Sequence, residues 1–143
     1  MAVNTIKADY KGGMHFTADV NGYKIEIGTE QPKEGEAPTS TRPKILMLVS
    51  LAGCTAFDIV TILNKMRVEF SDFTVQVDGN LTEPDNENDP KVYDAFTIHY
   101  TIKVKKEDEP KVQKAVKLSK EKYCGVSKML ERVAPIKYDI RYL

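Results

Sequence analysis

The chain has 143 residues, and its 21 basic and 21 acidic side chains give a formal net charge of zero. A chain of this length suits one domain and can bury a core without disulfide or metal support. A neutral chain lacks the basic surface that binds nucleic acid or an anionic membrane, so we expect neither as a partner. We therefore predict a single domain over residues 1–143.

The N-terminal segment lacks the apolar core of a signal peptide. The most apolar run, Ile45–Phe57, is shorter than the roughly 20 residues that cross a bilayer. We therefore expect a soluble protein of the cytoplasm. In that reducing compartment its two cysteines are more often free, catalytic or redox-active than joined in a structural bridge.

The first third of the chain predicts three strands. Residues 3–10 form a weak strand candidate, and residues 14–20 alternate between apolar and polar side chains. Asn21-Gly22 is typical of a two-residue hairpin turn, and residues 23–27 alternate again on the return strand. A polar loop with two prolines follows over residues 28–40.

A long helix is predicted in the middle of the chain. It begins at Thr41-Arg42-Pro43, where Thr41 or Ser40 can cap it and Pro43 suits the first turn, and runs to about Met66. Its first half, residues 45–51, is apolar on nearly every face and must be buried all round. A domain of this size encloses such a helix poorly, so we expect a second subunit to cover part of it. Gly53 weakens the helix and indicates that another backbone or a ligand comes close.

The rest of the chain alternates between strands and helices. A strand begins near Phe73, an acidic loop spans residues 84–90, and residues 96–104 give the clearest strand pattern. Two helices and a final strand over residues 136–142 follow. The predicted order is β-β-β-α-β-β-α-α-β, which is an α+β fold with antiparallel sheets around a long central helix.

Two cysteines are the candidate reactive residues. Cys54 lies inside the central helix, and Cys124 lies where one helix ends and the next begins, a place that stabilises a thiolate. For each cysteine alone, a buried side chain that acts as a small hydrophobe is the commoner alternative. Asp58 follows Cys54 by one helical turn and is expected to be a solvated or hydrogen-bonded carboxylate.

The sequence gives little support for histidine-based, metal or phosphate-binding chemistry. His15 and His99 fall on the polar side of their strands, so we expect surface histidines. The chain has no closely spaced Cys or His pair of the kind found in zinc motifs, and no glycine-rich phosphate loop. We predict no metal and no cofactor.

Two segments resemble one protein family. Residues 42–63, RPKILMLVSLAGCTAFDIVTIL, resemble the central helix of the OsmC/Ohr family, the osmotically induced and organic-hydroperoxide-resistance proteins. Residues 122–127, KYCGVS, resemble the second cysteine motif of that family. The resemblance implies an OsmC-like fold and an intertwined homodimer, with two central helices against the sheets and two sites at the interface.

The resemblance also implies thiol peroxidase chemistry. Cys54 would attack an organic hydroperoxide as the peroxidatic residue, Cys124 would resolve the sulfenic acid, and a dithiol reductant would reset the disulfide. Peroxidases of the family place an arginine near the turn after the first strand and a glutamate early in the central helix, and this chain has neither residue at those positions. Arg42 and Lys44 are the predicted substitutes that support the thiolate.

A second hypothesis keeps the fold and drops fast peroxide turnover. On that interpretation the protein binds a small hydrophobic ligand in an apolar cavity at the dimer interface.

Overall fold

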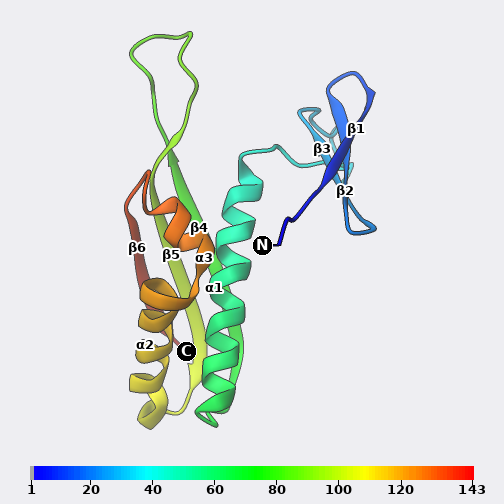
Figure 1. Ribbon diagram of the computed structural model, residues 1–143. Helices are drawn as coiled ribbons and strands as arrows, with labels where there is room; N and C mark the ends of the chain where they lie inside the picture. Colours follow the sequence, from blue (N-terminus) through cyan, green and yellow to red (C-terminus); the bar gives the residue numbers. More distant parts are fainter. Residues whose placement is uncertain (1) are drawn as a thin grey trace. The chain divides into compact units, whose positions relative to one another are not determined.

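A computed structural model describes residues 2–143, and their contacts divide the chain into two compact units, Met1–Met47 and Leu48–Leu143. The elements follow the predicted β-β-β-α-β-β-α-α-β order, which confirms the α+β class (Figure 1). Each unit carries its own three-stranded sheet. That the two units form one domain stays a prediction.

The first unit is an antiparallel sheet of β1 (Lys7–Gly12), β2 (His15–Val20) and β3 (Tyr23–Gly28). The predicted Asn21-Gly22 turn is confirmed, since both residues have positive φ, 53° and 90°, as a type I′ hairpin turn requires. The sheet buries little of its own surface. Its β1 strand is exposed throughout, and Tyr10, Met14 and Tyr23 are exposed.

The segment after β3 does not cap a helix at Thr41. Thr41 forms a parallel bridge with Ile27, and its backbone exchanges hydrogen bonds of 3.0 Å with Glu26 and Gly28. The helix α1 (Ile45–Lys65) begins four residues later. The predicted cap was therefore wrong, because Thr41 extends the edge of the sheet instead.

The second unit is built on the sheet β4-β5-β6, formed by β4 (Phe70–Leu81), β5 (Tyr93–Val104) and β6 (Ile136–Tyr142). The β4–β5 pair is antiparallel, whereas β6 runs parallel to β5. The prediction of wholly antiparallel sheets is corrected here. Two helices connect β5 to β6, and such a crossover returns the chain in the same direction.

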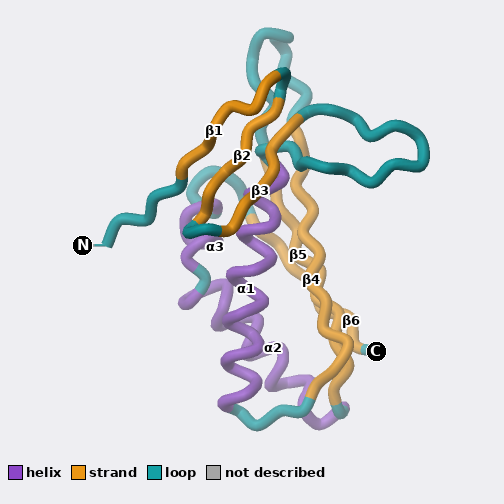
Figure 2. Tube along the Cα trace, turned by 90° about the vertical axis from the view of Figure 1, so that its right-hand side faces the viewer, coloured by secondary structure: helices purple, strands orange, loops and turns teal. Residues whose placement is uncertain are grey.

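The helices of the second unit lie on one face of this sheet, as Figure 2 shows for α1 and α2 (Glu109–Leu118). One stripe of α1, at a spacing of four residues, is buried: Leu51, Thr55, Ile59 and Leu63. It meets the inward side chains of β5: Phe96, Ile98, Tyr100 and Ile102. Gly79 in β4 permits the close fit, because a Cβ there would lie 2.7 Å from the ring of Tyr93.

Only that stripe of α1 is fully buried within the chain. Phe57 and Val49 are 77% and 62% exposed, so the prediction of a helix buried all round does not hold for one chain alone. Nothing lies within 4 Å of the position that a Cβ on Gly53 would take. The outer face of α1 is therefore apolar and open.

The same helix is long and apolar enough to cross a membrane by length and composition, with 21 residues and a mean hydropathy of 2.1 over its best window. The expectation that this segment is too short for a bilayer is thus wrong by length. The helix runs eight residues beyond Phe57, further than the apolar run alone indicated. The core helix of a soluble protein has the same length and composition.

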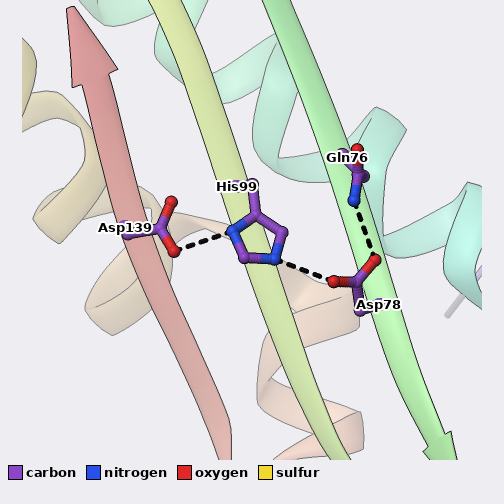
Figure 3. A network of polar contacts seen from close by, with 4 residues as sticks. All are labelled: Gln76, Asp78, His99 and Asp139. Carbon is purple, nitrogen blue, oxygen red and sulfur yellow. Dashed lines mark hydrogen bonds and ion pairs between the residues drawn. The ribbon is translucent and has the colours of Figure 1, made fainter.

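A polar network ties together the three strands on the sheet face opposite the helices (Figure 3). His99 on β5 contacts Asp139 on β6 through Nδ1 at 2.7 Å and Asp78 on β4 through Nε2 at 2.8 Å. Gln76 donates to the other oxygen of Asp78 at 3.0 Å. His99 was predicted to lie on the surface, and its side chain is 34% exposed, yet both ring nitrogens have carboxylate partners.

This network makes the stability of the sheet depend on pH. The hydrogen bond to Asp78 raises the pKa of His99, and Asp139 adds to the effect against the opposing effect of burial. A raised pKa contributes stability that is present below about pH 6.5 and lost as pH rises through the folded value. The hydrogen bonds from Gln76 and His99 lower the pKa of Asp78, so its contribution is lost only in acid.

We expect His99→Gln to lower the free energy of unfolding by about 0.5–1 kcal/mol near pH 5.5, a value scaled to an exposed charge pair. Near pH 9 the difference from wild type should shrink, because the imidazole is then neutral in both states. Urea unfolding at the two pH values measures this, with Asp78→Asn and the double variant completing a mutant cycle. A loss of equal size at both pH values would contradict it.

Candidate functional site

The fold of the second unit brings the two cysteines together. Cys54 lies in α1, and Cys124 lies seventy positions later, between α2 and the short helix α3 (Gly125–Leu130). The sulfur atoms and a carboxylate oxygen of Asp58 all lie within 4.8 Å of one another. Cys54 and Asp58 share one side of α1 because they are one turn apart. Both cysteines are free thiols packed against the hydrophobic core.

A π-helical turn, Ser119–Tyr123, places Cys124. The backbone N–H of Cys124 donates to the carbonyl of Ser119 at 2.8 Å, which closes the wider turn. Cys124 then becomes the N-cap of α3, and its Sγ accepts a hydrogen bond from the N–H of Ser127 at 3.3 Å. The predicted position of Cys124 at a helix junction is confirmed. Single π-turns of this kind occur often at functional sites.

Burial dominates the chemistry of Cys124. Its side chain is fully enclosed, and this burial raises the pKa of the Cys124 thiol, as does the neighbouring Cys54. The N–H and the hydroxyl of Ser127 act in the opposite direction and do not offset the burial. We expected the helix N-terminus to stabilise the Cys124 thiolate. Burial outweighs that effect, because the thiolate loses its hydration. Cys124 is held as a neutral thiol.

A chain of buried hydroxyl groups leads to Asp58. Tyr100 Oη lies 2.6 Å from Thr55 Oγ1, which lies 2.9 Å from Ser119 Oγ. Ser119 donates its proton to Asp58 Oδ2 at 3.0 Å. Since each hydroxyl has one proton, Thr55 must donate to Ser119 and Tyr100 to Thr55. The carboxylate of Asp58 is therefore fixed from the core side, in line with the predicted hydrogen-bonded carboxylate.

Tyr100 remains a donor throughout the physiological range. Burial raises the pKa of Tyr100 to about 12, although its bond to Thr55 acts against this. A buried tyrosine that keeps its proton fixes the direction of every bond in the chain. The orientation of Asp58 is consequently set by the sheet.

A cavity of about 340 Å³ opens beside Asp58. It lies between the second half of α1 and the end of α2 with the π-turn. Its lining is largely apolar with one lysine: Asp58, Thr61, Ile62, Lys65, Met66, Leu118 and Tyr123. The site thus has an adjoining space for a small organic molecule.

The predicted thiolate supports lie in a different unit of the chain from the cysteines. Arg42 and Lys44 precede α1 and belong to the first unit, whereas Cys54, Asp58 and Cys124 belong to the second. Their role stays a prediction. His15, which also belongs to the first unit, contacts Glu26 within the first sheet.

Sequence reasoning did not find Thr55, Tyr100 and Ser119 as members of the site. A signal was present, since each places a polar group at an inward position of its pattern: Thr55 on the buried stripe of α1, Tyr100 on β5 and Ser119 directly after α2, in line with its apolar face. Inward polar residues in an apolar pattern need partners. The identity of those partners depends on the packing of three elements.

The sequence model of one protein family, described as OsmC-like protein, matches residues 33–139 of this chain. The chain is 33% identical to Protein YhfA of Escherichia coli K12 over 97 residues, which cover 68% of this chain and 69% of that protein. The structure is also similar to a hypothetical protein from Aquifex aeolicus, with a TM-score of 0.80 and 26% identity over 100% of this chain and 99% of that one.

Two more distant structures share the fold. The OsmC-like protein from Mycoplasma pneumoniae has a TM-score of 0.80 at 14% identity, covering 99% of this chain and 98% of that one. The organic hydroperoxide resistance protein OhrB of Bacillus subtilis has a TM-score of 0.61 at 19% identity, covering 98% of each chain. The family model spans most of the chain and both cysteine segments lie inside the match, so this protein belongs to the OsmC/Ohr family of OsmC-like proteins.

Proposed function

We propose that the protein is a thiol peroxidase that reduces organic hydroperoxides, with Cys54 as the peroxidatic and Cys124 as the resolving residue. The observation that carries the proposal is the approach of the two sulfur atoms to within 4.8 Å from positions far apart in the sequence. Family membership supports it, since one structural neighbour is named an organic hydroperoxide resistance protein.

The two cysteines differ in the way the two roles require. Cys54 is half-buried, whereas Cys124 is fully enclosed. A peroxide can therefore reach Cys54 first. Cys124 has only to meet a sulfenic acid that forms beside it, and its buried neutral thiol is protected from direct oxidation.

The reaction then runs in three steps. The Cys54 thiolate attacks one oxygen of the hydroperoxide, the O–O bond breaks, and the leaving alkoxide takes a proton to become an alcohol. The Cys54 sulfenic acid next reacts with the Cys124 thiol, which forms the disulfide and releases water. A dithiol reductant finally reduces the disulfide by exchange and is itself oxidised.

The cavity beside Asp58 supports an organic substrate. Its apolar lining suits a hydrocarbon group, and Asp58 belongs to both the cavity and the cysteine cluster. The same cavity favours a second candidate function, the binding of a small hydrophobic ligand without fast peroxide turnover.

The proposed assembly is a homodimer that resides in the cytoplasm. The open apolar face of α1, with Val49, Gly53 and Phe57, supports a second copy as its cover. The sheet of the first unit adds exposed aromatic side chains, and three strands with so little buried surface need a cover to be stable. A net charge of zero offers little repulsion between two copies.

Treatment of the reduced protein with cumene hydroperoxide should consume the peroxide rapidly and yield a Cys54–Cys124 disulfide in stoichiometric amount. Cys54→Ser should abolish consumption, because no peroxidatic thiol remains. Cys124→Ser should accumulate a sulfenic acid at Cys54 that a dimedone reagent traps. Peptide mass spectrometry identifies each product.

Unreacted thiols at excess peroxide would overturn the peroxidase proposal. In that case, a rise in melting temperature with apolar ligands, which mass action requires of a ligand bound to the folded state, would support the binding function instead.

We expect Phe57→Glu to dissociate the dimer, because a charge would be buried in an apolar interface. Sedimentation velocity should show a shift to the monomer at micromolar concentration. Val133→Glu is the matched control, since Val133 is as exposed as Phe57 but lies beyond α3. A wild-type protein that sediments as a monomer would refute the proposed assembly.

A further inference from the structure

The cluster of Cys54, Asp58 and Cys124 has the donor set of a metal site. It offers two sulfur atoms and one carboxylate oxygen within 4.8 Å of one another. In a tetrahedral zinc site, ligand atoms lie about 3.8 Å apart, given zinc–sulfur bonds of about 2.3 Å. The three atoms would therefore have to approach by at most about 1 Å.

We propose that the reduced protein binds one zinc ion through Cys54 Sγ, Cys124 Sγ and a carboxylate oxygen of Asp58. Two thiolates and one oxygen favour a borderline-soft ion such as Zn²⁺ over Mg²⁺ or Ca²⁺, which prefer oxygen alone. Three protein ligands leave a fourth position for water, as in zinc sites that remain open.

The surroundings hold the donor atoms in place. Ser119 donates to Asp58 Oδ2 at 3.0 Å, which leaves Oδ1 for the metal. The N–H of Ser127 donates to Cys124 Sγ at 3.3 Å and orients that sulfur. Hydrogen bonds of this kind to ligand atoms typically strengthen metal binding by fixing their direction.

The charge balance of the cluster also favours a cation. No ion pair among residues 2–143 involves Asp58. The half-buried carboxylate thus lies beside two thiols without a cationic side chain in contact. A divalent ion would cancel two of the three negative charges that one carboxylate and two thiolates carry. The sequence has no closely spaced Cys or His pair and therefore predicted no zinc site. Such motifs reveal only ligands that are close together in the sequence, whereas Cys54 and Cys124 are seventy positions apart.

Zinc and the disulfide exclude each other, because both use the same two sulfur atoms. Binding of Zn²⁺ displaces one proton from each thiol and leaves the oxidation state unchanged. Oxidation of the pair removes two electrons and two of the three ligands, so it should release the metal. Zinc binding itself needs only the reduced cluster and does not depend on peroxidase activity.

The test is a Zn²⁺ titration of the reduced, tag-free protein under anaerobic conditions, in competition with a chromophoric chelator. One equivalent should bind per chain. Co²⁺ in place of Zn²⁺ should give sulfur-to-metal charge-transfer bands and the intense visible bands of tetrahedral cobalt. Disulfide formation by diamide should abolish binding.

Variants separate the ligands from the background. Cys54→Ser and Cys124→Ser should each lower the charge-transfer intensity, because one of two thiolates is lost, and weaken zinc binding at least about a hundredfold, and Asp58→Asn should weaken it at least about tenfold. Asp85→Asn, an exposed carboxylate in the β4–β5 loop, is the control and should change nothing. Asp58→Glu, which keeps the carboxylate, should retain most of the affinity if Asp58→Asn disturbs the fold.

Three results would overturn the proposal: no binding in competition with the chelator, binding that Asp58→Asn and both serine variants leave unchanged, or binding that survives disulfide formation. Failure of the peroxide reaction with intact zinc binding would overturn the peroxidase proposal alone. Loss of zinc binding with an intact peroxide reaction would overturn the metal proposal alone.

Discussion

The hydrogen bonds of the Thr55 hydroxyl are the contacts on which the arrangement of the site depends. This hydroxyl lies on the buried stripe of α1 and bonds to Tyr100 on β5 and Ser119 at the end of α2. A buried hydroxyl without partners would cost about 1–3 kcal/mol, so the helix, the sheet and the crossover must dock in one register. In that register Cys54, the residue before Thr55, lies close to Cys124, the residue that follows the π-turn.

The site therefore combines a rigid polar support with two sulfur atoms in different environments. Burial fixes Cys124 as a neutral thiol and leaves Cys54 the more accessible of the two. Asp58 is oriented by the hydroxyl chain and faces both the cysteines and the adjoining cavity. The same geometry supports a redox pair and a metal-binding trio, because both functions need two nearby thiols and differ only in the oxidation state of the sulfur.

The two faces of α1 differ in burial. The stripe of Leu51, Ile59 and Leu63 forms the core of the second unit, as an amphipathic helix on a sheet normally does. The opposite face keeps Phe57 and Val49 in solvent within one chain, which is costly for an apolar surface and gives the reason for a second copy. Within one chain, one face of this apolar helix thus lies in the core and the other stays exposed, and the proposed second copy would cover the exposed face.

The sequence by itself determined the order of the elements, the Asn21-Gly22 turn and the presence of the strand β5, because these follow from local periodicity and turn chemistry. It also indicated Cys54 and Cys124 as individual candidates and placed Asp58 one helical turn after Cys54. Only the tertiary structure decided that they meet, that β6 runs parallel to β5, and that His99 bonds two carboxylates. The physical reason is that, apart from the local Cys54–Asp58 pair, these contacts join residues more than twenty positions apart, and their approach is set by how side chains pack between elements, which no local pattern records.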